Sequence, residues 1–490
     1  MLVESRGMSL PVYSSHNSAL SLFQSALHEV LSQEPAQQDS NHSGIGVTAL
    51  APEMLATAQV VKQFDHTGSF NVPQAAVAPG PAAAANPPSV RDVCATLAAQ
   101  IALYSVTDPA KAATLRQELT AGSCDPLWVQ CLAVYNAYRL SNTAQPYINY
   151  QKLSDFVIEN CFPDEATIAV IGDWGTGMND ALVLLEQIGQ NFQPDVLLHL
   201  GDIYYSGLPS ECKSHFTDLI DKVWPPAGPR KRPRVFTLDG NHDRYAGSNG
   251  GYYELIKSLN QPNSYFAFRN NFWQFLAMDT GYYDADPNAT RAGTALTKLV
   301  DQEAVWHFDK INNCGVNVDK SVNPGGARGT VLLSHHQLYS FSGVGRNAAG
   351  AQMAVNPYLA NLFTPVFDQI DLWLWGHEHW LCIFEPYSYG GHPMPKGRCV
   401  GASAVPVYLA QKPGPDPHLA PSPGENRPPR TVPGTDLGHN GTVFNYCYAI
   451  MGLAGPKLSV DYYQVNSTDA TPGNPPPLGT PVYSETIEKG

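Results

Sequence analysis

Five segments of the chain place metal-binding side chains directly after short apolar runs. Carboxylate, amide and imidazole groups are the ligands that hard and borderline metal ions prefer. A single Gly-Asp or Asn-His pair usually only closes a turn, but five such segments in order indicate a metal site. Two cations in one site lie about 3.5–4 Å apart and need a carboxylate between them to screen their repulsion. The segments are 172–173, 201–202, 240–243, 334–336 and 376–379.

The apolar runs before these residues are predicted to be strands that alternate with helices. Such alternation is typical of β-α-β units with a largely parallel, buried sheet, whose chemistry gathers beyond the carboxyl ends of the strands. Strands are expected over 167–173, 195–202, 234–240, 265–269, 272–279, 330–335 and 371–377, and later over 381–386, 399–408, 446–453 and 457–464. Helices are expected over 179–192, 209–224 and 295–313.

The first 160 residues are predicted to form a helical extension without a site of its own. Apolar residues recur at helical spacing over 18–31, 90–106 and 126–140. The Ala- and Pro-rich stretch 71–90 is expected to be a tether. The catalytic domain is expected over 161–465, with a Pro-rich insertion at 412–434 that is either a lid or a disordered loop, and a Pro-rich tail at 466–490.

Composition excludes several classes of function. The net charge of −14 would repel a nucleic-acid backbone and an anionic membrane surface. We expect no membrane span, because no apolar stretch is long enough, and the N-terminus lacks the apolar core of a signal peptide. The 9 cysteines are an odd number without a Cys-x-x-Cys pair, which favours free thiols in a reducing compartment and a cytoplasmic location.

The motifs GDWG (172–175), GDIYY (201–205), GNHD (240–243), LLSH (332–335) and GHEH (376–379) resemble those of the calcineurin-like metallophosphoesterase superfamily. The usual first motif there is Asp-x-His, whereas this chain has Gly175 in place of the histidine and Tyr205 three residues after Asp202. That combination is similar to the purple acid phosphatase branch, in particular its tartrate-resistant form. The resemblance covers about 165–465 and implies an α/β fold, more closely an α+β sandwich, with a four-layer αββα core and a helical N-terminal extension.

The resemblance also implies a binuclear centre of Fe(III) with a divalent Fe, Zn or Mn ion. A phenolate is a hard anionic donor that favours trivalent iron, so a tyrosine ligand would fill the place of the missing histidine. The ligands carried over are Asp173, Tyr205 and His379 for the trivalent ion, Asp202 as the bridge, and Asn241, His335 and His377 for the divalent ion.

Residues beside the ligands are candidates for catalysis and substrate binding. His242 resembles the residue that protonates the leaving alkoxide or orients the phosphate. His336 follows the ligand His335 and is a candidate catalytic or phosphate-contacting histidine. Arg346 lies on a Gly-rich loop and either clamps a phosphate or is simply solvated. Asp243 either orients His242 or closes the turn.

Together these features predict a binuclear metal-dependent phosphatase. It would hydrolyse phosphomonoesters by attack of a metal-bound hydroxide on phosphorus, with a small phosphate ester as its partner and no nucleic acid. One alternative is a phosphodiesterase acting on nucleotides or lipid head groups, since the same site serves both reactions. Another is a catalytically silent scaffold that binds a partner, although every ligand position is filled. The natural substrate and the oligomeric state stay open.

Overall fold

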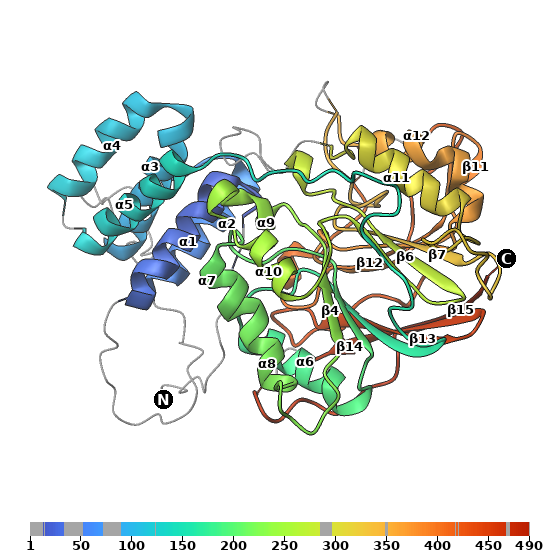
Figure 1. Cartoon of the computed structure of the whole chain (residues 1–490). Helices are drawn as coiled ribbons and strands as arrows, with labels where there is room; N and C mark the ends of the chain where they lie inside the picture. The colour runs from blue at the N-terminus through green and yellow to red at the C-terminus, as the bar shows by residue number, and fades with distance from the viewer. Residues whose placement is uncertain are drawn as a thin grey trace.

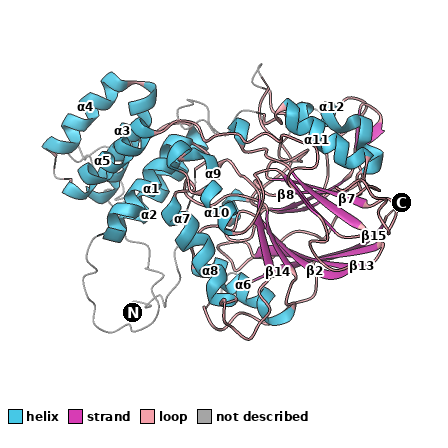
Figure 2. Ribbon diagram, viewed as in Figure 1, coloured by secondary structure: helices cyan, strands magenta, loops and turns pink. Residues whose placement is uncertain are grey.

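The computed structural model describes most of the chain. The described residues are 13, 15–33, 52–71, 90–122, 124–284, 296–347, 351–416, 418–419, 421–466 and 471–489. They form a helical N-terminal region beside a larger domain of two packed β-sheets (Figures 1 and 2). Among the helices that are described, none is sufficiently long and apolar to cross a membrane.

Two mixed sheets face each other in the larger domain. The first has the strand order β1-β5-β6-β7-β8-β12-β9, and the second has the order β15-β14-β13-β2-β3-β4. Neighbouring strands are parallel from β6 to β12 and from β2 to β4, but the second sheet continues through the antiparallel strands β13, β14 and β15. The expectation of a largely parallel sheet is therefore corrected to two mixed sheets.

The strands agree with most of the expected ranges, though the last one was not expected. Residues 466–490 were predicted to be a tail, yet Tyr483–Glu488 forms β15 and pairs with β14 at the edge of the second sheet. The first sheet consists of β1 (Val157–Ile158), β5 (Phe266–Arg269), β6 (Trp273–Ala277), β7 (Gly329–Ser334), β8 (Leu372–Trp375), β12 (Lys396–Val400) and β9 (Leu381–Ile383). The second consists of β2 (Glu165–Ile171), β3 (Val196–His199), β4 (Arg234–Thr237), β13 (Tyr446–Ala454), β14 (Lys457–Val465) and β15.

Helices cover the outer faces of both sheets, which completes the four-layer αββα arrangement (Figure 2). The second sheet packs against α6 (Asn179–Asn191) and α8 (Asp218–Val223), and the first packs against α11 (Asp301–Asn312) and α12 (Pro357–Phe363). Shorter elements are α7 (Pro209–Glu211), a π-helical turn (Cys212–Thr217), α9 (His242–Tyr245), α10 (Tyr252–Ser258) and the hairpin of β10 (Ser388–Tyr389) and β11 (His392–Pro393).

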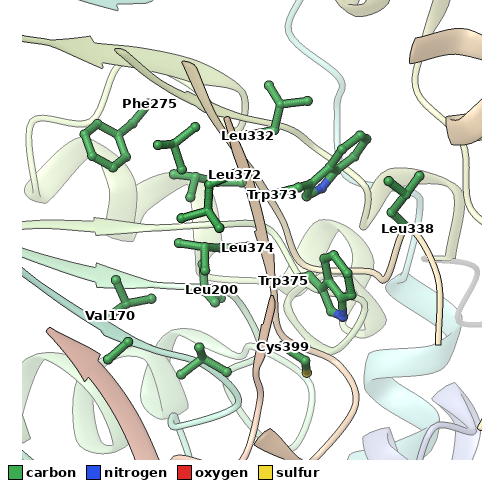
Figure 3. Packing of buried hydrophobic residues seen from close by; sticks show 14 of the residues in the cluster. Val170, Leu200, Phe275, Leu332, Leu338, Leu372, Trp373, Leu374, Trp375 and Cys399 are labelled. Atoms are coloured by element: carbon green, nitrogen blue, oxygen red, sulfur yellow. The ribbon is translucent and has the colours of Figure 1, made fainter. Parts of the chain in front are cut away.

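The core lies between the sheets because successive side chains of a strand point to opposite faces. Along β8, Leu372 and Leu374 point toward the facing sheet, where Leu374 lies beside Leu200, whereas Trp373 and Trp375 point the other way (Figure 3). All four β8 side chains are fully buried. This packing holds the carboxyl ends of strands from both sheets at one edge.

The Pro-rich insertion at 412–434 packs against the first sheet where it is described. The Val432 N–H donates to the carbonyl of Ile383 at 2.7 Å, and the Glu385 N–H donates to the carbonyl of Arg430 at 2.9 Å. Leu419 is buried in the main core. These contacts disfavour the disordered-loop alternative, and a lid function stays a prediction.

The N-terminal region contains two helices that were not expected. The predicted helices are present as α1 (Ser18–Gln33), α3 (Val90–Thr107) and α5 (Pro126–Ser141), and α2 (Pro52–Thr67) and α4 (Pro109–Ala121) join them. Helix α4 begins with the capping residue Asp108 and with Pro109, a pair that is typical of the start of a helix. The tether predicted at 71–90 lies mostly outside the described residues.

Two cysteines in this region correct the expectation of free thiols. Cys94 and Cys124 form a disulfide between α3 and the segment before α5. The other 7 cysteines are free. Because disulfides persist mainly in oxidising compartments, this bond argues against the cytoplasmic location, which stays a prediction.

Candidate metal centre

The predicted ligands lie in loops that follow strands of both sheets. Asp173 follows β2, Asp202 follows β3, and Asn241 follows β4; from the first sheet, His335 follows β7 and His377 follows β8. Asp173, Asp202, Asn241 and His335 are fully buried. The facing sheets thus bring together residues that are as many as 204 positions apart in the sequence, such as Asp173 and His377.

The backbone of these loops is held in unusual conformations. Asp173, Asp202 and His377 have positive φ angles of 54°, 75° and 62°. Such conformations are uncommon for residues other than glycine and cluster at functional sites, where the surrounding structure holds them in place. Gly240 is needed for close approach, since a Cβ there would lie 2.1 Å from Oδ1 of Asp202.

One group of donor atoms contains Asp173, His379 and a tyrosine. The Tyr204 hydroxyl lies 2.9 Å from Oδ1 of Asp173 and 3.1 Å from Nε2 of His379. Nε2 of His379 lies 3.4 Å from the same Asp173 oxygen. Three donors of types that bind metal ions therefore converge on one point.

A second group contains Asn241, His335 and His377. Oδ1 of Asn241 lies 3.1 Å from Nε2 of His335 and 3.0 Å from Nδ1 of His377. Nδ1 of His335 contacts the carbonyl of Leu200 at 2.8 Å, so a neutral ring that donates there presents Nε2 as an acceptor. The Asn241 amide donates to the Tyr245 hydroxyl at 2.6 Å, which turns its oxygen toward the histidines. Converging acceptor atoms of this kind fit a cation.

Asp202 connects the two groups. Its Oδ2 accepts a hydrogen bond from the Tyr204 hydroxyl at 3.2 Å, while its Oδ1 lies 3.3 Å from Nε2 of His335. Burial alone would lower the pKa of His335, yet the Asp202 carboxylate beside it raises that pKa to about 10. Positive charge, either as a proton on His335 or as a bound cation, is therefore favoured beside the Asp202 carboxylate.

The structure places Tyr204, rather than the predicted Tyr205, among these donors. The Tyr205 side chain packs into the apolar cluster formed with the N-terminal helices, and its N–H donates to Oε1 of Glu211 at 2.8 Å. Burial and the nearby Glu211 carboxylate raise the pKa of Tyr205. The two tyrosines are adjacent and both pack in this cluster, so spacing from Asp202 did not distinguish them; the contacts of the Tyr204 hydroxyl with Asp173 and His379 correct the prediction.

His242 lies beside Asp202 and is fully buried. Its Nδ1 contacts the carbonyl of Tyr205 at 2.7 Å, whereas its Nε2 has no hydrogen-bond partner in the described residues and lies 4.0 Å from Oδ2 of Asp202. The Asp243 carboxylate accepts hydrogen bonds from the N–H groups of Asp202, Ile203 and Gly240. Of the two alternatives for Asp243, closing the turn is therefore the one observed.

The remaining candidates differ in their positions. His336 adjoins the centre, with its ring centroid 4.4 Å from that of His377, but Nδ1 lies 3.0 Å from Oγ1 of Thr280 and Nε2 lies 3.2 Å from Oδ2 of Asp284. Arg346 is exposed and forms a β-bridge with Gln352. It is thus a surface residue, unlike the buried ligands.

His16 approaches the centre although no sequence pattern singled it out. Its ring centroid lies 4.9 Å from that of His377, 5.7 Å from that of His379 and 5.8 Å from that of His242. Burial is the main cause that lowers the pKa of His16 to about 3. A lone histidine in a Ser-rich segment before a helix carries no local signal for such a place.

Comparisons with known proteins agree with the fold. Residues 166–381 match the calcineurin-like phosphoesterase family, so the chain contains a domain of this kind. No curated protein matches the chain. Metallophosphoesterase domains bind divalent metals and are generally hydrolytic, and the donor atoms described above fit that chemistry.

The chain is also similar to several solved structures, and at these identities the likeness concerns the fold only. One is purple acid phosphatase PPD1 from yellow lupin (Lupinus luteus), at 16% identity and a TM-score of 0.38, covering 67% of this chain and 55% of the lupin chain. Another is PhoD, at 14% identity and a TM-score of 0.41, covering 71% of each chain. A third is GAP50, described as the anchor in the inner membrane complex of Plasmodium, at 12% identity and a TM-score of 0.40, covering 66% and 89%.

Proposed function

We propose that this protein is a binuclear metal-dependent phosphatase that hydrolyses phosphomonoesters. The observation that carries the proposal is the position of Asp202, whose two carboxylate oxygens contact one donor group each. A site for a single ion would not need a carboxylate shared in this way. The scaffold alternative offers no reason for such a set of buried donors, since buried polar groups without a ligand are costly.

The donor types suggest which ions these residues would hold. Asp173, Tyr204 and His379 would hold a trivalent iron, because a phenolate and a carboxylate are hard anionic donors. Asn241, His335 and His377 would hold a divalent Fe, Zn or Mn ion, with Asp202 between the two. Bound ions would supply Lewis acidity toward the phosphoryl oxygens and would acidify a water molecule.

His242 is positioned to pass a proton to the leaving group. A hydrogen bond from its Nδ1 to the Tyr205 carbonyl would fix the ring and direct Nε2 toward the centre. From Nε2 a proton would pass to the oxygen of the departing alcohol. Aryl phosphates with good leaving groups need this proton far less than alkyl phosphates do.

The test compares His242→Ala with the wild-type protein on alkyl and on activated aryl phosphates. Turnover of alkyl phosphates should fall about 10²–10⁴-fold, while turnover of aryl phosphates should fall much less. The exposed His439 serves as a matched control, since His439→Ala removes an imidazole from the surface. Equal losses on both kinds of ester would contradict the role of His242 as an acid.

Metal analysis and a diester substrate test the rest of the proposal. Two metal ions per chain are expected, and removing them with a chelator should abolish hydrolysis. A p-nitrophenyl monoester should be cleaved faster than the corresponding diester. The reverse preference would favour the phosphodiesterase alternative, and a folded protein without bound metal or activity would favour the scaffold.

A further inference from the structure

Three partly exposed histidine rings lie together at the candidate centre, and one of them comes from the N-terminal region. His377 and His379 are partly exposed, and His16 lies over them with its ring plane only 26° from that of His379. The ligand candidates beside them, Asp173, Asp202, Asn241 and His335, are fully buried. His16 is therefore one of three partly exposed rings around these buried ligands.

The backbone of His16 is connected to the centre by hydrogen bonds. The Tyr245 hydroxyl donates to the carbonyl of His16 at 2.7 Å, and the same hydroxyl accepts from the amide of Asn241 at 2.6 Å. On either side, the Ser15 hydroxyl donates to Asp65 of α2 at 2.8 Å, and Asn17 caps α1 through the N–H of Leu20 at 3.1 Å. This network holds His16 in one position.

Helix α1 is packed too firmly to act as a loose cover. Its side chains Leu20, Phe23 and Leu27 are almost fully buried in the apolar cluster that also contains Tyr204 and Leu208 of the catalytic domain. A segment with this much buried apolar surface stays in place, because undocking would expose that surface to water. His16 is therefore a fixed part of the wall of the site.

Nδ1 of His16 is buried and has no hydrogen-bond partner among the described residues. A buried polar atom normally has one, so a missing partner points to a group that is not part of the protein. The ring centroid of His16 lies 4.9 Å from that of His377, about as far as the rings of His335 and His377 lie from each other at 5.1 Å. A group bound at the centre is therefore within reach of the unpartnered Nδ1 of His16.

We propose that His16 is a substrate-binding residue that hydrogen bonds to a phosphoryl oxygen of the bound ester, so that the N-terminal region completes the active site. The inference rests on the proposed phosphatase function. It assigns the recognition of a tetrahedral phosphoryl group to a residue that lies 157 positions before Asp173, outside the matched domain.

The test measures binding of inorganic phosphate to the full-length, metal-loaded protein by calorimetry, with metal content determined in parallel. His16→Ala should raise the dissociation constant about 10–100-fold, as expected for a hydrogen bond to a charged group, without changing the metal content. His16→Gln, whose amide can also donate, should restore part of the affinity. His66→Ala, which removes an exposed histidine from α2, should bind phosphate as the wild type does.

Three other results would contradict the inference, and a fourth would contradict the proposed function. An unchanged dissociation constant in His16→Ala would show that His16 does not contact the phosphate. Loss of a metal ion would make His16 a ligand, and tighter binding would make it an obstruction. A wild-type protein that binds neither metal nor phosphate would instead refute the proposed function itself.

Discussion

Glu211 holds the loop that presents Tyr204, and its replacement should destabilise the whole protein. The side chain is buried at 1% exposure. Its Oε1 accepts from the N–H of Tyr205 at 2.8 Å and from the Ser25 hydroxyl of α1 at 2.7 Å. Its Oε2 accepts from the N–H groups of Ser206 and Leu208, both at 3.0 Å. One carboxylate thus connects the loop to the N-terminal region.

The size of the effect follows from the donors left without a partner. A hydrogen bond to a charged group contributes about 1.5–3 kcal/mol, and an unpaired buried donor costs about 1–3 kcal/mol. Glu211→Ala leaves three backbone N–H groups and one hydroxyl unpaired, apart from water that enters the space. We expect a loss of roughly 3–5 kcal/mol in the free energy of unfolding, since such terms do not add fully.

Two milder variants make the reasoning testable in urea denaturation. Glu211→Gln keeps one acceptor oxygen but turns an NH2 group toward two donors, so about 2–3 kcal/mol should be lost. Ser25→Ala breaks only the contact with α1 and should cost about 1–2 kcal/mol. A Glu211→Ala protein within about 0.5 kcal/mol of the wild type would refute the claim that this carboxylate holds the loop.

In iron-loaded protein, Tyr204→Phe should abolish the phenolate-to-iron absorption band and Tyr205→Phe should retain it; the opposite result would restore the spacing-based assignment. A chain that begins at Tyr150 should be insoluble, because Tyr204 and Tyr205 lose their apolar cover, and a soluble, active fragment would contradict this. Burial raises the pKa of Asp180 to about 6 from its ordinary 3.8, even though Tyr446 donates a hydrogen bond to it. The folded state therefore holds the proton of Asp180 more tightly than the unfolded state does. The free energy of unfolding should fall by about 3 kcal/mol as the pH rises from 3.8 to about 6. Asp180→Asn should flatten this pH dependence, as measured by denaturation at several pH values.

The sequence by itself predicted most of the elements and the positions of the ligands. Strands such as β2 and β8 are continuous apolar runs, and α1 and α6 show helical spacing, so their types follow from short-range patterns. Strand β15 was missed because Ile487 is its only buried residue and a Pro-rich stretch of sequence separates it from its partner β14. Strand direction in a mixed sheet likewise depends on pairing between remote segments.

The positions of the ligands follow from the local sequence, since in most motifs a glycine at the end of a strand is followed directly by the polar residue that serves as a ligand. Which of two adjacent tyrosines contacts the other donors is not local. Glu211 holds the backbone of Tyr205, both tyrosines pack against α1, and the Tyr204 hydroxyl reaches Asp173. The place of His16 depends even more on tertiary structure. It is held through Tyr245, more than two hundred residues later in the chain, and only the packing of α1 on the catalytic domain brings the two together.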